Sequence, residues 1–418
     1  MLRSFIRRLS CTTPSSADYD LLPDTAAVTS APPPLGPITR LPPELVHLVF
    51  TFIDPSTLAA CSLVCAGWLP HARRRMFSRV SISLHNAHRF GRLLAAAPPR
   101  ALASFPAHVR AIELDDRIAD DFWAAEVLPK YVAHFERLTT LCFFGALPRA
   151  LPRAFAAVTH LELNYVYTSL PRRLEAFIAS LPRLETLKVT QEKGPYFPVS
   201  GEYRPSSALR RVDLDDPSLL HWIITSHPSP KLEAIQLEIS RPETLVMLES
   251  LRRLSSLESL DLILTDLEVG ASFLTKKYLS STTQLRSLRI QADHSHAAHI
   301  LLHLLSYIDT ARLASLSLDF AIPYLSELDG PAVLTLLPWD ALDAALARLP
   351  ALRRLAVVKV FVSPPGWRSR VSQRAVLLDA ADRMPRCRGR CGPDPLPPER
   401  PPSPAAGSPR FCDDLYEL

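Results

Sequence analysis

One pattern, apolar-x-x-apolar-x-apolar, recurs ten times along most of this chain of 418 residues. Its copies begin 20 to 29 residues apart, and only the last interval, of 39, is longer. Stretches with helical periodicity, such as "PRRLEAFIASLP" and "WDALDAALARLP", lie between them. A strand and a helix repeated at this period predict a stacked α/β solenoid, because each unit can bury its apolar face only against its neighbours. The ten copies are Val109-Ile112-Leu114, Leu138-Leu141-Phe143, Val158-Leu161-Leu163, Leu184-Leu187-Val189, Leu209-Val212-Leu214, Leu232-Ile235-Leu237, Leu257-Leu260-Leu262, Leu285-Leu288-Ile290, Leu313-Leu316-Leu318 and Leu352-Leu355-Val357.

The period of these copies resembles that of leucine-rich repeats, which is about 20–29 residues. The predicted fold class is therefore α/β: an irregular leucine-rich-repeat solenoid with parallel strands and outer helices, preceded by a small all-α module. The earlier segment "FSRVSISL" has the same spacing and predicts the strand that joins the two parts. No copy carries Asn eight residues after its first apolar position, and Asp293 is the only near match. Without an asparagine ladder we expect irregular turns, uneven strands and, in the longest interval, an insertion around "LDGPAVLTLLPWD".

The segment before the repeats, "LPPELVHLVFTFIDPSTLAACSLVCAGW" from Leu41 to Trp68, has the pattern of short amphipathic helices. Its opening prolines suit a first helical turn, and the apolar residues that follow recur at i, i+3, i+4, i+7 and i+8. Pro55 ends this helix, because the residue before a proline is pushed out of the α region. Ser56 or Thr57 can then cap a second helix. A unit this small buries little apolar surface by itself, so it needs a partner or another support.

The same segment resembles an F-box, with its Leu-Pro-x-Glu-Leu opening, its Asp-Pro turn and its Val-Cys-x-x-Trp close. An F-box followed by leucine-rich repeats resembles the substrate receptors of SCF cullin–RING ubiquitin ligases. The resemblance implies that the helical module docks on the Skp adaptor and that the repeats hold the protein to be ubiquitylated. Such a receptor acts by proximity and performs no bond chemistry itself. The residues expected to contact the adaptor are Leu41, Pro42, Leu45, Leu48, Val49, Ile53, Leu58, Val64 and Trp68.

The apolar side chains of this module allow two interpretations. They are too many and too large for so small a unit to cover, and an exposed patch rich in Leu and Trp is a usual partner-binding surface. Alternatively, they pack on the first repeats as the N-terminal cap that solenoids require. The chain would then be a leucine-rich-repeat scaffold or binding module unrelated to ubiquitylation. We favour the adaptor surface because the opening, the turn and the closing Trp occur in register.

The residues between the apolar positions of the repeats should point outward from the strands, which line the concave face of a leucine-rich-repeat sheet. Acidic residues outnumber basic ones at these positions. One interpretation is a surface for a target protein that presents a basic segment, and the other is a merely solvated sheet face. The residues expected to contact a target are Glu113, Asp115, Glu162, Lys188, Asp213, Asp215, Glu238, Asp261, Arg289 and Asp319.

Composition argues against several other classes of protein. A net charge of +5 is small for this length, and no basic run has the density typical of nucleic-acid binding. Seven unevenly spaced Cys do not form a disulfide framework, which favours the reducing cytoplasm or nucleus. The longest run free of Asp, Glu, Lys and Arg is Pro55 to Ala72, which prolines interrupt, so no membrane span is expected.

Both ends of the chain have the composition of disordered tails, rich in Pro, Ser and Arg. Arg3, Arg7 and Arg8 give the first residues a faint resemblance to a mitochondrial presequence, but a disordered tail is the simpler interpretation. The predicted parts are a disordered N-terminal tail (1–39), an F-box-like helical module (40–78), a leucine-rich-repeat solenoid (79–385) and a disordered Pro/Arg-rich C-terminal tail (386–418).

Catalytic and metal-binding motifs are sparse in this sequence. It contains no Gly-x-Ser-x-Gly, no phosphate-binding loop and no His-Glu-x-x-His. The paired acids Asp115-Asp116 and Asp215-Asp216 follow predicted strands at equivalent places, and repetition explains them without a carboxylate pair. His clustering in "DHSHAAHILLH" and the spacing of Cys387 and Cys391 could suggest zinc, but an amphipathic helix and a tail explain them more simply. Cys61 and Cys65 match apolar packing positions. We therefore expect no enzyme activity, no cofactor and no metal.

Overall fold

The computed structural model describes most of the two regions predicted to fold. The described residues are 42–64, 67–96, 106–115, 130, 135–146, 155–167, 171–191, 201–228, 230–275, 277–279, 282–293, 296–308, 311–323, 337–362, 375–377 and 383–387. The predicted tails, except for Arg386 and Cys387, lie outside the described residues, as does most of the predicted insertion. The chain divides between Asp54 and Pro55 into two compact units.

The predicted helical module spans the division between these units. Helix α2 (Pro43–Thr51) belongs to the first unit, whereas α3 (Pro55–Cys61) and α4 (Leu69–Met76) belong to the second. Prolines occupy the first turn of all three helices, where their missing N–H groups need no partner. Helices α3 and α4 pack on each other, and α4 also packs on the short helix η2 (Pro106–His108). The predicted boundaries 40–78 therefore do not coincide with a unit of the structure.

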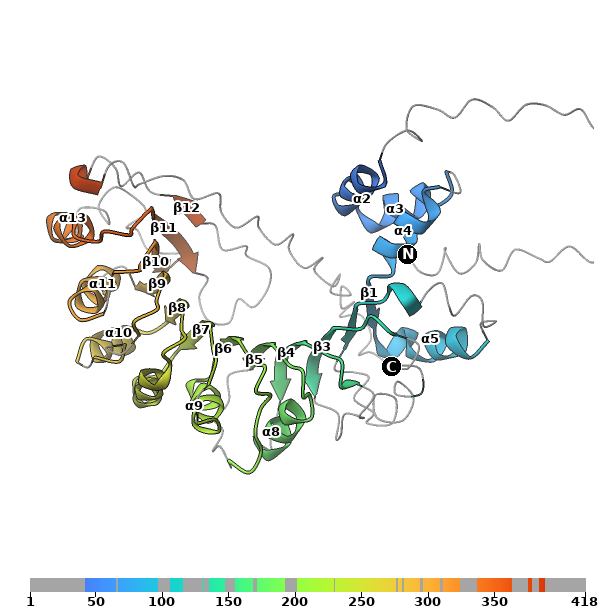
Figure 1. Cartoon of the computed structure of the whole chain (residues 1–418), viewed down its shortest axis with the longest axis horizontal. Helices are drawn as coiled ribbons and strands as arrows, with labels where there is room; N and C mark the ends of the chain where they lie inside the picture. Colours follow the sequence, from blue (N-terminus) through green and yellow to red (C-terminus); the bar gives the residue numbers. More distant parts are fainter. Residues whose placement is uncertain are drawn as a thin grey trace, which may run out of the picture. The chain divides into compact units, whose positions relative to one another are not determined.

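The second unit is built on one sheet of twelve strands within the described residues, in which the strand order follows the chain (Figure 1). The first eleven strands are parallel, as predicted. All ten sequence copies form strands β2 to β11, and "FSRVSISL" supplies β1. The strands are β1 (Arg79–Ile82), β2 (Ala111–Leu114), β3 (Thr140–Ala146), β4 (His160–Tyr167), β5 (Thr186–Gln191), β6 (Arg211–Leu214), β7 (Ala234–Ile239), β8 (Ser259–Leu264), β9 (Ser287–Asp293), β10 (Ser315–Pro323), β11 (Arg354–Val362) and β12 (Ala375–Leu377).

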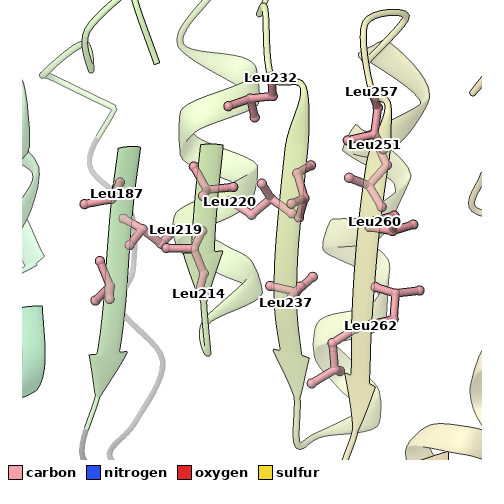
Figure 2. Close-up of a cluster of buried hydrophobic side chains, with 14 of the residues drawn as sticks. Leu187, Leu214, Leu219, Leu220, Leu232, Leu237, Leu251, Leu257, Leu260 and Leu262 are labelled. Carbon is pink, nitrogen blue, oxygen red and sulfur yellow. The ribbon is translucent and has the colours of Figure 1, made fainter. Parts of the chain in front are cut away.

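The apolar positions of the repeat build the core of this unit. Every one of them, apart from Val357 whose side chain is not described, is at most 4% exposed. Complete burial of such a side chain contributes about 1.5–3 kcal/mol, so the repeated pattern is the main source of stability. Figure 2 shows leucines of neighbouring strands, such as Leu187, Leu214 and Leu237, beside Leu219 and Leu220 of the helix between β6 and β7.

Helices cover the face of the sheet that carries these leucines (Figure 1). They are α5 (Leu84–Ala96), α8 (Pro171–Ala179), α9 (Pro217–Thr225), η6 (Pro242–Arg253), α10 (Leu267–Phe273), α11 (Ala297–Leu305) and α13 (Trp339–Ala347). Asp216 caps α9 by accepting a hydrogen bond from the Ser218 backbone N–H at 2.8 Å, and Asp266 caps α10 in the same way at 2.7 Å. The residues of η6 form a 3₁₀-helix, whereas the other six are α-helices.

A regular set of hydrogen bonds fixes the register between repeats. In each repeat two successive backbone N–H groups donate to one carbonyl of the preceding repeat, as Arg110 and Ala111 do to the Ser78 oxygen at 2.9 and 3.0 Å. Equivalent residues therefore lie side by side from β1 to β11. Strand lengths range from four to nine residues before the short β12, which agrees with the expected irregularity. Thr265 lies eight residues after Leu257, where an asparagine ladder would have Asn. Its backbone N–H donates to the Ile239 oxygen at 3.1 Å.

Two features of the C-terminal part were not predicted. Strand β12 is antiparallel to β11 and forms the end of the sheet. After it, the 3₁₀-helix η7 (Pro385–Cys387) packs on α13, where Asp343 accepts hydrogen bonds from the backbone N–H groups of Arg386 and Cys387, both at 3.1 Å. Cys387 is buried, so the first two residues of the range predicted to be the C-terminal tail belong to η7. A proline-rich sequence gives no sign of this tertiary contact.

Candidate protein-binding surfaces

Helix α2 has two apolar sides that differ in exposure. Leu45, Leu48 and Val49 are 48%, 54% and 52% exposed, whereas Val46 and Phe50 are 8% and 2% exposed. The exposed residues have the spacing i, i+3, i+4 of one helical face, and the buried pair has the spacing i, i+4 of another. One apolar side of this helix is therefore exposed to solvent within this chain.

Two exposed apolar residues were not among those expected from the sequence to contact the adaptor. Phe52 is 84% exposed, and Leu63, in the turn after α3, is 80% exposed. Phe52 lies three and four residues after Val49 and Leu48, so helical spacing could have placed it on the same face. Leu63 precedes the predicted Val64, which is 63% exposed. No periodicity marks Leu63, because it lies in a turn.

The other predicted adaptor residues differ in their surroundings. Pro42 is exposed, Ile53 and Trp68 are partly buried, and Leu41 lies outside the described residues. Leu58 is only 2% exposed, so in this conformation its side chain is part of the packing and offers no surface to a partner. We use the name adaptor face for the exposed apolar residues of α2 and its C-terminal end, which are Leu45, Leu48, Val49 and Phe52. Leu63 and Val64 are also exposed, but they belong to the second unit.

The side of the sheet opposite its helices carries the residues between the buried positions, and we call it the outward face. Strand pairing aligns one residue of each repeat in a continuous row. This central row contains six of the ten residues predicted to contact a target. From β1 to β10 the row reads Ser81, Glu113, Cys142, Glu162, Lys188, Asp213, Gln236, Asp261, Arg289 and Ser317.

At the start of the row, charged groups pair across strands. Arg79 forms an ion pair with Glu113, and Lys188 Nζ lies 3.2 Å from Glu162 Oε1. The Cys142 thiol between them donates to Glu162 Oε2 at 3.5 Å. Burial and the nearby Glu162 carboxylate raise the pKa of Cys142 to about 12, so this thiol stays protonated. Burial also pushes the pKa of Glu162 upward, but Lys188 and hydrogen bonds outweigh it and lower that pKa.

At the other end of the row, Arg289 connects two carboxylates. Its Nη2 lies 2.6 Å from Asp319 Oδ2 and its Nη1 lies 3.4 Å from Asp261 Oδ2. Asp319 also accepts a hydrogen bond from Ser317 Oγ at 2.7 Å and is only 1% exposed. We expected Asp319 to point outward to a target, but the guanidinium of Arg289 covers it, and it holds that arginine in place instead. Cross-strand pairing of this kind depends on register, which the repeat pattern alone does not describe.

The carboxyl group of Asp261, in the middle of the outward face, has a raised pKa. Burial raises its pKa to about 6, the Asp319 and Asp213 carboxylates add to this rise, and Arg289 opposes it. The pKa of Arg289 is raised, because Asp319 and Asp261 outweigh the effect of its burial. The remaining predicted residues lie on the same face: Asp115 is exposed, and Asp213, Asp215 and Glu238 are partly buried. Negative charge therefore persists along the middle of the sheet.

The histidine and cysteine clusters form no metal site in the part of the chain that is described. No group of three or more His, Cys, Asp or Glu side chains there is arranged to hold a metal ion. His299 is exposed on α11, and the ring of His303 packs edge-on against Tyr307. His294, Cys65, Cys391 and Asp116 lie outside the described residues. Among the helices that are described, none combines the length and hydrophobicity needed to cross a bilayer.

Comparison with known proteins gives a family match in the N-terminal part of the chain. A family model described as F-box-like matches residues 38–83, which include α2, α3, α4 and β1. No curated protein matches the sequence. One solved structure that matches is a leucine-rich-repeat protein of Leptospira interrogans, at 13% identity over 64% of this chain and 83% of that chain. Its TM-score is 0.20, so nothing about this fold is inferred from it.

Proposed function

We propose that this chain, an F-box-like segment joined to a leucine-rich-repeat sheet, is the substrate-recognition subunit of an SCF-type cullin–RING ubiquitin ligase. The F-box-like segment docks on the Skp adaptor, and the outward face of the sheet holds the target. The observation that carries the proposal is the adaptor face, whose four large apolar side chains are each 48% or more exposed inside the segment that matches the F-box-like family. Exposed apolar patches of this kind mark protein-binding sites.

The adaptor face provides the anchors that a protein interface needs. Interface energy is concentrated in a few large side chains that become desolvated, and neighbouring residues contribute little. Phe52 has the most area left to bury, and Leu48 and Val49 lie beside it on one helical face. The partner should therefore bring an apolar groove, not a charged one.

The alternative function, a scaffold whose N-terminal helices only cap the repeats, is favoured by one observation. Helix α4 packs on η2, and Ala72 within α4 is fully buried. Helix α4 thus covers part of the first repeats, as a cap does. Capping by α4 does not account for the exposed residues of α2, which is why we propose docking for them.

The outward face is the proposed target site. It presents Glu113, Glu162, Asp213 and Asp261 in one continuous row. Arg79, Lys188 and Arg289 neutralise part of this charge, and acidic groups of the outward face remain in excess of basic ones. A target with a basic segment fits this charge distribution. Holding such a target near a charged ubiquitin carrier raises its effective concentration, and the chain needs no catalytic group for that.

Adaptor capture tests the proposal with variants matched for exposure. Val49→Asp places a charge on the adaptor face, and Val246→Asp places the same charge on η6, where Val246 is 48% exposed. We expect Val49→Asp to weaken capture of purified Skp adaptor at least about 30-fold, because a hot-spot residue contributes about 2 kcal/mol or more. Val246→Asp should bind as the wild type does. Failure of the wild type to bind the adaptor, or equal binding by both variants, rejects the proposal and favours the scaffold.

A further inference from the structure

Five exposed arginines gather at the edge where the sheet begins, away from the rows of the outward face. Arg73, Arg74 and Arg75 form the last turn of α4, and Arg110 and Arg137 lie just before strands β2 and β3. We call these five residues the arginine cluster. Glu136 is the one acidic residue described in the same turns.

Sheet hydrogen bonding holds the parts of this cluster together. The Arg110 backbone N–H donates to the Ser78 oxygen, two residues after α4, and the Thr139 N–H donates to the Arg110 oxygen, each at 2.9 Å. Because Arg137 lies two residues before Thr139, it is carried by the repeat next to that of Arg110. The cluster therefore extends over α4 and two neighbouring repeats.

The pKa of His108 is sensitive to the positive charge of this region. It lies in η2, on which α4 packs, at the repeat position equivalent to that of Arg137. Burial lowers the pKa of His108, and the charges of Arg137, Arg74 and Arg73 lower it further. Three arginines from two separate elements thus act on one imidazole. The positive charges of these arginines disfavour protonation of His108.

The same edge of the sheet is neutralised further along the chain. Arg210 and Arg286 occupy the repeat position of Arg110, and each pairs with a glutamate at that position in a neighbouring repeat. Their partners are Glu233 and Glu258. The residue at that position next to Arg110 is Thr139, which cannot neutralise a charge.

No carboxylate of the described residues forms an ion pair with Arg73, Arg74, Arg110 or Arg137 in this structure. Arginines in a last helical turn can serve the helix dipole, but that explanation covers α4 only. Arg110 and Arg137 lie in turns, where no helix end needs them. The described carboxylates therefore do not supply the complement of these four arginines.

We propose that the arginine cluster binds an acidic segment of a partner protein, a run of Asp and Glu side chains. Guanidinium groups bind carboxylates in bidentate geometry, and Arg73, Arg74, Arg110 and Arg137, on three elements, suit an extended acidic chain. Binding of single-stranded nucleic acid usually adds aromatic platforms. The exposed aromatic residues of the described chain are Phe52, Tyr165 and Tyr203, and none of them belongs to α4, η2 or the turn before β3. This inference does not depend on adaptor docking.

Fluorescence anisotropy of a labelled peptide of about ten glutamates tests the proposal on the full chain. At about 50 mM salt we expect Arg73→Glu with Arg74→Glu to weaken binding at least about tenfold, and the difference to shrink at about 500 mM salt. The matched control, Arg252→Glu with Arg253→Glu, reverses two adjacent exposed arginines in the last turn of η6. It should bind the peptide nearly as well as the wild type.

Two further variants separate charge from folding. Arg73→Lys with Arg74→Lys should keep most of the affinity, and Arg137→Glu, which lies on another element, should weaken binding about threefold. Equal losses in the cluster and control variants, or no loss at all, overturn the proposal. Tighter binding of an oligouridine than of the peptide, abolished by Arg73→Glu with Arg74→Glu, also overturns it in favour of nucleic acid. Adaptor capture by the wild type is measured separately, so the two proposals can fail independently.

Discussion

Leucine and valine side chains are covered in one region of this protein and exposed in another. In the repeats, the apolar positions whose side chains are described are at most 4% exposed, whereas the four residues of the adaptor face are 48% or more exposed. Both regions are rich in leucine and valine, so residue type alone does not explain the difference. In the sheet each repeat has neighbours that cover it, but α2 and the turn after α3 present their apolar residues to the exterior. The contrast teaches that exposed apolar surface here is local, not a consequence of a poorly formed core.

A leucine-to-alanine substitution should destabilise the protein strongly in the repeats and hardly at all on the adaptor face. Leu260→Ala removes a side chain that is 1% exposed, and we expect it to cost about 2–5 kcal/mol because a cavity remains. Leu48→Ala should change the free energy of unfolding by less than about 0.5 kcal/mol. Urea denaturation followed by circular dichroism measures both. Comparable destabilisation by the two substitutions would show that Leu48 belongs to a core and would remove the contrast.

The outward face should respond to pH through Asp261. Its pKa is raised to about 6 in the folded protein, so the folded state binds the proton more tightly than the unfolded state does. Stability from this group is therefore greatest at low pH and falls as pH rises through the window from about 4 to 6. The side chain in Asp261→Asn cannot ionise, so this variant should not lose stability from this position as the pH rises. Relative to the wild type, the variant should gain about 2 kcal/mol between pH 4.5 and 7.5, measured by urea denaturation. A pH-independent difference between the two proteins would contradict the assignment.

The edge of the sheet should show the smallest effect. Arg210 and Glu233 form an ion pair across repeats, but both side chains are more than a third exposed. Solvent screening limits such a pair to about 0–1 kcal/mol. We expect the coupling energy of Arg210→Ala and Glu233→Ala, from a double-mutant cycle in urea, to lie below about 1 kcal/mol. A larger value would mean that edge charges stabilise the repeats, and the arginine cluster would then need a structural explanation.

Much of the fold could be predicted from the sequence because its cause is local and repeated. Each apolar-x-x-apolar-x-apolar copy specifies a strand with one buried face, and all ten copies became strands in one parallel sheet. Features that depend on distant contacts could not be predicted. The burial of Cys387 requires Asp343, which lies 44 residues away, and strand β12 requires the far edge of β11.

The candidate surfaces were predicted in part, for a physical reason. Helical spacing identifies which residues share a face, but not which face is covered, so Leu58 was expected to be open and Phe52 was not assigned. Alternation in the strands places Asp319 on the outward face, but its burial comes from Arg289 on the neighbouring strand. The register between strands determines which charged residues lie opposite each other and form ion pairs, and only the structure gives that register.

Hydrogen exchange of the full chain with and without purified Skp adaptor tests the central claim most directly. If the adaptor face is a docking surface, backbone amides of α2 should gain protection on adding the adaptor, while β5 to β9 stay unchanged. If those amides are unaffected while the adaptor binds elsewhere, or if the wild type shows no protection at any adaptor concentration, the exposed apolar side chains of this segment do not dock on that partner.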